Sequence, residues 1–285
     1  GLGVDTLSDG MVMGFGMCLN DGDTEAGQGG QKGWTGWGPY SIVYGKNSPA
    51  CGLLTIRGES VPGSTLATFT PVQYTQDEID GRGVENAELG YNVYSAVTTL
   101  DAVLDDWDGI PILAQTPFRR GGTVGADANG ATGGGPWCEF DEYNGGIHNG
   151  VADQSMAFAL AFDTLNLYMG INAIDDTHQN GHTGDNGGWD GDSVQIAFTN
   201  AARDAPASEM ILYNYGLNDD GVTHTLHHER HPCPVSDDCT ETSMQRFEDT
   251  TTTVYEIKIP AHGLGVDTLT DGMQMGFGMC LNDGD

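Results

Sequence analysis

Residues 193–199 read SVQIAFT, and residues 252–259 read TTVYEIKI. Apolar and polar side chains alternate in both stretches, which is the period of a strand with one buried face. Similar runs, separated by clusters of Gly, Asp and Asn, stand at 11–19, 39–44, 53–56, 155–160, 165–174, 210–215 and 273–281. Because no long amphipathic stretch interrupts them, the sequence predicts an all-β fold. We expect an antiparallel β-sandwich of the jelly-roll or immunoglobulin type.

The end of the chain repeats its beginning. Residues 1–23 and 263–285, which are offset by 262 positions, differ only at Ser8 against Thr270 and at Val12 against Gln274. Such agreement indicates duplication, and a period of this length corresponds to a whole domain with a linker. We expect one sandwich domain per repeat, in a chain cut from a longer tandem array. The alternative is a single protein with a locally duplicated hairpin.

The positions of the strand-like runs divide the chain into three parts. Residues 1–56 are expected to be the C-terminal strands of a preceding sandwich domain. Residues 57–83 are polar and contain Pro, Gly, Ser and Thr, which is typical of a linker or an extended arm. Residues 84–285 are then the next sandwich domain, which lacks its last strands.

The chain is strongly acidic. It has 41 acidic residues, 29 of them Asp, against 10 Lys and Arg, for a net charge of −31. This charge excludes nucleic acid and anionic membrane surfaces as natural partners, and no apolar run approaches the length of a membrane span. The excess of acids has two interpretations, a solvated surface as in salt-adapted proteins or a set of calcium sites.

Six cysteines are present, but Cys18 and Cys280 occupy the same repeat position. Cys233 and Cys239 are close in sequence and are predicted to form a disulfide. The pairing of Cys18, Cys51, Cys138 and Cys280 stays open. Because Cys-x-x-Cys motifs are absent from the sequence, the cysteines favour an oxidising, extracellular or cell-surface location over a redox or zinc-ribbon role.

Short acidic and glycine-rich segments are candidate calcium sites. Calcium takes six to eight oxygen ligands, and glycine lets backbone carbonyls join the carboxylates. The alternative is that these segments are acidic turns on a solvated surface. The candidate ligands are Asp185, Asn186, Asp190, Asp192, Asp175, Asp176, Asp21 and Asp23, with Asp105, Asp106 and Asp108 as a further group.

Aromatic residues give the candidate sugar-binding surface. Trp34 and Trp37 lie in a glycine-rich loop, where an exposed indole ring can stack on a pyranose face, and Trp189 could complete a cleft. The alternative for these residues is packing at the end of the sandwich or at an interface, while Trp107 is expected in the core. The histidine-rich run 224–231 is either a zinc or copper site or a polar loop.

The order of several motifs resembles the family 9 carbohydrate-binding modules, which are DOMON-like β-sandwiches. The matching segments are LDDWDGIP at 104–111, VAD at 151–153, AFD at 161–163, IDDTH at 174–178, WDGDSVQI at 189–196, YEIKIP at 255–260, and residues 14–23 with 33–44. The resemblance implies a sandwich with bound calcium, aromatic sugar binding and a place in secreted polysaccharide hydrolases or surface proteins. One departure is that the family normally occurs once or twice beside a catalytic domain, whereas this unit recurs.

Two functions follow from these observations. The first is an extracellular structural or adhesive repeat protein, a fibre, stalk or surface filament, whose partners are other copies or neighbouring repeats joined through exposed sandwich edges. The second is an array of carbohydrate-binding modules of a secreted polysaccharide-degrading enzyme. No enzymatic role is expected for these residues, because the sequence has no Gly-x-Ser-x-Gly, phosphate-loop or His-Glu-x-x-His motif.

Overall fold

A computed structural model of the chain describes most of the second half and parts of the first. The described residues are 13–15, 17–20, 33–37, 52–57, 66–68, 70, 90–115, 118–119, 139–142, 149–181, 189, 191–222, 224–229, 232–233 and 239–282. Their regular structure is β-strand with short 3-10 turns, which confirms the predicted all-β class. Among them, no helix has the length and hydropathy that crossing a membrane requires.

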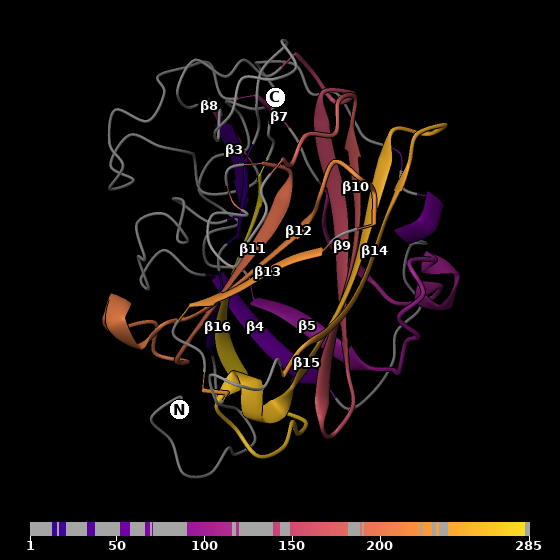
Figure 1. The fold of residues 1–285 in the computed structure, drawn as a ribbon. Helices are drawn as coiled ribbons and strands as arrows, with labels where there is room; N and C mark the ends of the chain where they lie inside the picture. Colours follow the sequence, from indigo (N-terminus) through magenta and orange to yellow (C-terminus); the bar gives the residue numbers. More distant parts are fainter. Residues whose placement is uncertain are drawn as a thin grey trace.

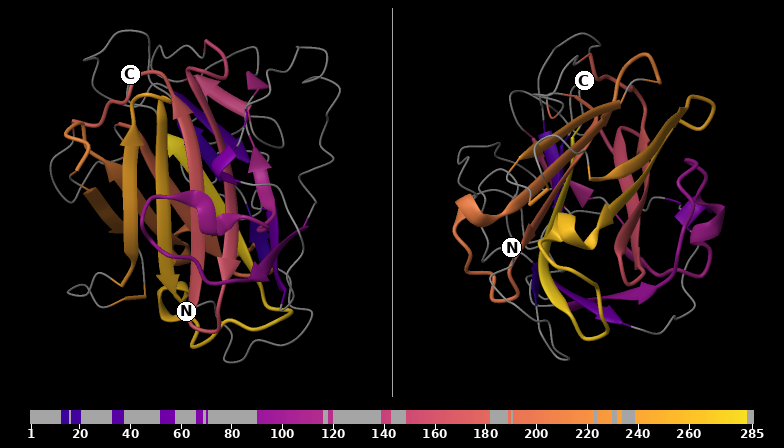
Figure 2. Two further views of the ribbon diagram at one scale, coloured as in Figure 1. Left: turned by 90° about the vertical axis from the view of Figure 1, so that its right-hand side faces the viewer. Right: turned by 60° about the horizontal axis from the view of Figure 1, so that its bottom comes forward.

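The strands form one continuous sheet that folds around a core into two facing layers (Figures 1 and 2). The first layer contains β14 (Glu241–Phe247), β15 (Thr252–Pro260), β10 (Asn166–Asp175), β9 (Gln154–Phe162) and β6 (Ile112–Gln115). The second contains β13 (His224–Glu229), β12 (Ile211–Leu217), β11 (Ser193–Thr199), β16 (Gln274–Asn282) and β4 (Gly52–Arg57). The predicted sandwich is therefore confirmed.

The connection between the two layers differs from the prediction. β5 (Gly90–Ser95) pairs in parallel with β4 on one edge and with β9 on the other, so the sheet is mixed. Parallel neighbours cannot be joined by a tight hairpin, and β4 and β5 are separated by residues 58–89. The alternation of apolar and polar residues predicts where strands occur, but not whether neighbouring strands run parallel or antiparallel.

Shorter strands extend the sheet at one end. They are β1 (Met13–Phe15), β2 (Met17–Asn20), β3 (Gly33–Trp37), β7 (Phe118–Arg119) and β8 (Glu139–Glu142). β3 and β4 follow one another along the same edge of β16. The expected division into residues 1–56, 57–83 and 84–285 is not tested by this pairing and stays a prediction.

The main core lies between the two layers and is built from alternate residues of each strand. On β10, Leu167, Met169, Ile171 and Ala173 face it, and Phe198 and Phe277 meet them from the other layer. The rings of Phe198 and Phe277 lie 5.3 Å apart. Burial of each of these Leu, Met, Ile and Phe side chains stabilises the fold by about 1.5–3 kcal/mol.

The outer face of the first layer is also covered, which explains why every residue of β9 is buried. The turn η4 (Leu104–Trp107) lies across this face (Figure 2), and Trp107 is fully buried there as expected. The indole packs directly on Gly170 of β10, where an added Cβ would come within 2.6 Å of the ring. Glycine at this position is what allows the turn to approach the sheet.

Glu256 of β15 fixes the same turn by hydrogen bonds. Its carboxylate accepts from Trp107 Nε1 at 2.8 Å, from the Asp101 amide at 2.8 Å and from the Ala102 amide at 2.6 Å. Ala102 has a φ of 59°, a conformation that is costly for a side chain with a Cβ. The paired amides stabilise that conformation. Burial raises the pKa of Glu256, and these three hydrogen bonds oppose that rise.

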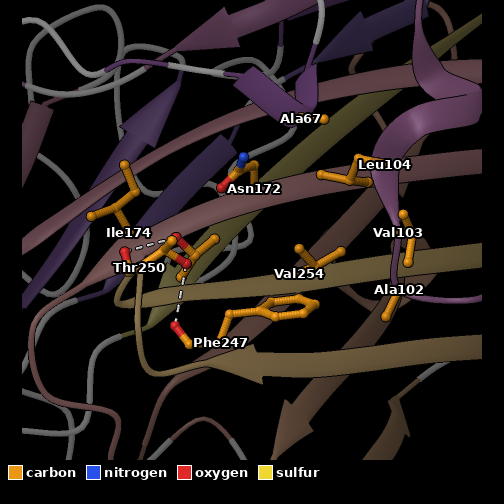
Figure 3. A pocket seen from close by; sticks show the side chains of 10 residues that line it. Ala67, Ala102, Val103, Leu104, Asn172, Ile174, Phe247, Thr250 and Val254 are labelled. Carbon is orange, nitrogen blue, oxygen red and sulfur yellow. Dashed lines mark hydrogen bonds between the residues drawn. The ribbon is translucent and has the colours of Figure 1, made fainter.

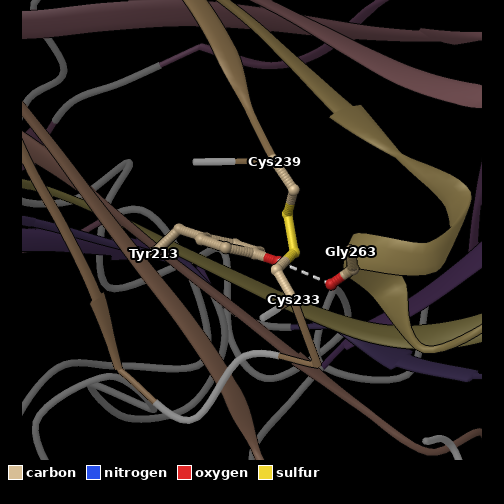
Figure 4. Close-up of a disulfide and its surroundings, with 4 residues drawn as sticks. All are labelled: Tyr213, Cys233, Cys239 and Gly263. Atoms are coloured by element: carbon tan, nitrogen blue, oxygen red, sulfur yellow. Dashed lines mark hydrogen bonds between the residues drawn. A yellow bond between two sulfur atoms is a disulfide. The ribbon is translucent and has the colours of Figure 1, made fainter. Parts of the chain in front are cut away.

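The predicted disulfide between Cys233 and Cys239 is present in the connection from β13 to β14 (Figure 4). The two Cα atoms are 6.1 Å apart. Tyr213 of β12 lies beside it and donates a 2.5 Å hydrogen bond to the carbonyl of Gly263 in η7 (Ala261–Leu264). The disulfide and this bond together join the edge of one layer to the end of β15.

We expect that Gly170→Ala destabilises the protein by about 2 kcal/mol, because the new methyl group would overlap a rigid indole ring in a closely packed layer. Urea unfolding followed by circular dichroism measures the change. Gly181→Ala is the matched control, since the nearest atom to its added Cβ is 3.4 Å away on the exposed loop side. Equal stability of the two variants would contradict the packing account of Gly170.

Candidate functional site

The candidate site lies at the end of the sandwich where several strands start or finish. β10 ends at Asp175, β12 ends at Leu217, β11 begins at Ser193 and β16 ends at Asn282 (Figure 1). Asn282 pairs with Ser193 on one side and with Trp34 of β3 on the other. The sequence candidates on β10, β11 and β3 therefore come to the same end of the molecule.

The connection between β10 and β11 is tied down by reciprocal hydrogen bonds. The Gln179 amide donates to Asp192 Oδ2 at 2.6 Å, and the Asp192 amide donates back to the Gln179 carbonyl at 2.9 Å. Asn180 Nδ2 donates to the Asp192 carbonyl at 2.9 Å. Gly191 is required between them, because an added Cβ would lie 2.6 Å from the Gln179 oxygen.

A buried group of charged side chains joins the two layers at this end. We call it the interlayer cluster: Asp175 and Arg246 from the first layer, with His178 and Asp192 from the connection to the second. His178 Nδ1 lies 2.8 Å from Asp192 Oδ2, and Arg246 Nη1 lies 3.8 Å from Asp175 Oδ2. Arg246 Nη2 also donates to the Asp175 carbonyl at 2.9 Å.

The protonation of the interlayer cluster is shifted by burial and by its neighbours. Burial raises the pKa of Asp175 well above 3.8, and the charge of Asp192 raises it further against the opposing effect of Arg246. Burial lowers the pKa of His178, but the hydrogen bond and charge of Asp192 outweigh this, so its pKa is raised above 6.5. His178 Nε2 also donates to the Leu217 carbonyl at 3.0 Å. Asp192 and the Leu217 carbonyl thus lie beside the two nitrogens of the His178 ring.

The described part of the interlayer cluster does not fit a calcium ion by itself. Asp175, His178 and Asp192 bring three potential ligand atoms within 4.8 Å of one another. One of them is a nitrogen, and the guanidinium of Arg246 lies beside the carboxylates, whereas calcium prefers six to eight oxygens. Asp176 is exposed. The remaining candidates, Asp21, Asp23, Asp185, Asn186 and Asp190, lie outside the described residues, so calcium stays a prediction.

The three candidate tryptophans are described to different extents. Trp189 is half-buried and shortly precedes Asp192. Trp34 and Trp37 belong to β3 and not to a loop as expected, because Trp34 pairs with Asn282 and Trp37 with Met17. Their side chains lie outside the described set. The backbone register therefore brings the Trp34 position to the end of the sandwich that carries Trp189.

One concave feature was not anticipated from the sequence. It is a cavity of about 430 Å³ on the outer face of the first layer (Figure 3). Phe247, Val254, Leu104 and Ile174 give it an apolar lining, and buried Asn172 contributes an amide whose Oδ1 has no hydrogen-bond partner in the described structure. Its residues come from β10, β14, β15 and two 3-10 turns, so no local motif could have indicated it.

Comparisons with known proteins give a family match and similar solved structures. The family model described as "Carbohydrate family 9 binding domain-like" matches residues 124–285, more than half of the chain. Two similar solved structures are of a family 9 carbohydrate-binding module (CBM9) from Caldicellulosiruptor kristjanssonii, one in complex with glucose and one with cellotriose. The first is 16% identical with a TM-score of 0.42, and the match covers 68% of this chain and 78% of that chain.

The second structure is 15% identical with a TM-score of 0.40, and its match covers 68% of this chain and 76% of that chain. None of the curated proteins matches the chain.

The interlayer cluster predicts how stability depends on pH when metal ions are chelated. The folded-state pKa values of Asp175 and His178 are both raised, so both groups stabilise the fold at low pH and lose that contribution as pH rises. The free energy of unfolding should fall as pH increases from about 4 to above 7, by about 1.4 kcal/mol per unit of pKa shift.

Urea unfolding in EDTA across this pH range measures the effect. Asp175→Asn, which is neutral at every pH, should flatten the acidic part of the profile, while the exposed neighbour change Asp176→Asn should leave it unaltered. A stability that rises steadily with pH in the wild-type protein would refute the assignment.

Proposed function

The chain belongs to the carbohydrate family 9 binding domain-like family, and from this premise we propose that it is a non-catalytic module that binds polysaccharide. The observation that carries the proposal is the family match over residues 124–285, together with a β-sandwich of the kind the sequence resemblance implied. In this proposal the module holds a secreted polysaccharide-degrading enzyme on its substrate, and the chemistry is done elsewhere in the protein.

We place the sugar site at the strand end that carries β3 and Trp189. Ser193 and Trp34 flank Asn282 from opposite edges of β16, so their backbones are two strand spacings apart, about 10 Å. That separation matches the width of one or two sugar rings. Indole rings there would supply stacking surfaces, with amides and hydroxyls of the rim as hydrogen-bond partners.

The cavity at Phe247 is the competing location. It has one aromatic ring and an unpartnered amide oxygen on Asn172, but its threonine hydroxyls already donate to backbone carbonyls. A sugar carries many hydroxyls and needs several partners that are still available. This favours the strand end over the cavity.

The net charge narrows the class of polysaccharide. A chain with a charge of −31 repels polyanions at low and moderate ionic strength. We therefore propose neutral glycans, such as β-glucans or xylans, over uronic-acid polymers. The disulfide between Cys233 and Cys239 supports a secreted protein, because such bonds persist in oxidising environments.

The structural or adhesive array is the second candidate, and one observation favours it: the near-identity of residues 1–23 and 263–285. Repeated modules on one chain would bind a polymer more tightly than one module alone, since later contacts are intramolecular. Repetition is thus compatible with both candidates, whereas the family match supports sugar binding specifically. We adopt sugar binding as the primary function.

The expected outcome of sugar-binding tests is retention of the protein by neutral glucan or xylan gels and little retention by polygalacturonate. Trp34→Ala, Trp37→Ala and Trp189→Ala should each weaken binding by about two- to tenfold, because an aromatic stacking contact contributes about 0.5–1.5 kcal/mol. Affinity electrophoresis and calorimetry with oligosaccharides measure this. Phe247→Ala is the matched control. A loss of glycan binding confined to that variant would place the site in the cavity instead. Absence of binding to every glycan tested would refute the proposal.

Calcium is proposed as a structural ion held mainly by Asp185, Asn186 and Asp190, with Asp21 and Asp23 as a second group. Added calcium should raise the melting temperature by several degrees, because an ion that binds only the folded state stabilises it in proportion to its occupancy. Differential scanning calorimetry with calcium, magnesium or EDTA tests this. An unchanged melting temperature in all three, with Asp190→Asn equal to wild type, would exclude the ion.

A further inference from the structure

The two copies of the repeated segment occupy the same register in the sheet. Leu54 of β4 pairs with Met13 of β1 and with Met275 of β16, and Gly36 of β3 pairs with both Cys18 and Cys280. Three further positions agree. Leu53 pairs with both Gly14 and Gly276, Gly52 with both Phe15 and Phe277, and Trp34 with both Asn20 and Asn282. At all these positions the two copies therefore have the same partner.

A strand has only two edges, and this makes the two copies alternatives. One edge of β4 is taken by β5, which pairs with Leu53–Arg57 in parallel. Only one edge is left for either β1 or β16. In the strand order of the sheet, β16 lies between β11 and β4, whereas β1 is not part of this order.

One residue distinguishes the copies in this pairing. Gln274 of β16 donates a 2.9 Å hydrogen bond to Thr55 Oγ1 of β4, and both side chains are buried. The first copy has Val12 at the matching position, which has no donor. A buried hydrogen bond of ordinary strength favours β16 over the first copy by about fivefold.

Proximity along the chain favours the first copy instead. Cys18 precedes its partner Gly36 by a short segment, whereas most of the chain separates Gly36 from Cys280. The second loop is longer by more than an order of magnitude, so closing the shorter loop is favoured by about fiftyfold in an unfolded chain. The first copy therefore competes while the chain folds, and β16 competes through its contacts once the sandwich is formed.

We propose that β3 and β4 form an exchangeable pair, which can leave its own β16 and fill the slot between β16 and β5 of a second copy of this chain. Leu54 and Ile56 are fully buried, so an unfilled slot would expose core and unpaired strand edges, which another copy can satisfy with the same contacts. Reciprocal exchange gives a closed pair of chains, and sequential exchange gives a head-to-tail row.

Leu66 is the first described residue after β4, and it bounds the part of the chain that exchanges. Leu66 is fully buried on the outer face, where its carbonyl accepts a 3.1 Å hydrogen bond from Asn172. The segment 58–65 can span at most about 30 Å. That length allows β4 to reach an adjacent copy while Leu66 stays in place. Exchange of β3 and β4 between chains does not require a bound sugar.

The test uses full-length chains with one new cysteine each. Thr55 and Gln274 are direct partners in the β4–β16 pair. An isotope-labelled Thr55→Cys chain and an unlabelled Gln274→Cys chain are refolded together and oxidised, and digests are searched for a peptide that joins positions 55 and 274. Because each chain has only one of the two cysteines, this peptide forms only between chains. The double variant at high dilution is the control that both substitutions fold and link within one chain.

We expect the interchain peptide to increase with protein concentration, and light scattering of the wild-type protein to show multiples of 30.1 kDa. Val12→Gln gives the first copy the same donor and so strengthens its hold on the free edge of β4, which should reduce the interchain β4–β16 link by about two- to fivefold. The proposal is overturned if the link forms only within the double variant while wild type remains monomeric, if oligomers form without the link, or if Val12→Gln has no effect on exchange.

Discussion

The hydrogen bonding of β16 on both edges is the constraint on which the sheet depends. β11 pairs through all its residues with one edge of β16, from Gly276 to Asn282, and β4 and β3 share the other edge. Through β4 and β5 this connects the second layer to β9 and the first layer. Without β16, the core residues Leu54 of β4 and Phe198 of β11 would lose the strand that lies between them.

Two buried polar groups then fix how the ends and faces of the sandwich are closed. Glu256 holds the turn that carries Trp107 against the outer face, and the interlayer cluster joins the two layers at the strand end. In each case a buried charge is compensated by several donors or by an opposite charge, which is the condition for tolerating it. The connection that carries Trp189, which is proposed to contact sugar, is thus held in place by the interlayer cluster beside it.

The sequence was most informative where chemistry is local. Alternation predicted β11, β12, β15 and β16, and the short Cys233–Cys239 spacing predicted the disulfide, because each pattern lies within a few residues. The packing of Trp107 on Gly170 joins residues far apart in sequence, and the parallel pairing of β5 has no local signature.

The candidate site shows the same limit. The sequence grouped Asp175 with Asp176 and Asp192 with Asp190, whereas the fold joins Asp175 and Asp192 with His178 and Arg246. An acidic run predicts carboxylates, but the neighbours that decide whether they bind a proton, an arginine or a metal come from other strands. The Phe247 cavity was missed for this reason too, since several separate elements line it.

The antiparallel register of β3 and β16 also has a mechanical consequence. Trp34, near the start of β3, faces Asn282, at the end of β16. A force that pulls the chain apart before β3 and after β16 therefore acts at one end of the ladder, and its hydrogen bonds open one after another as in a zipper. The β3–β16 ladder would therefore separate at a lower force than strand pairs that are pulled in shear, parallel to their axes. The module would lengthen at low force while most of its core stays packed.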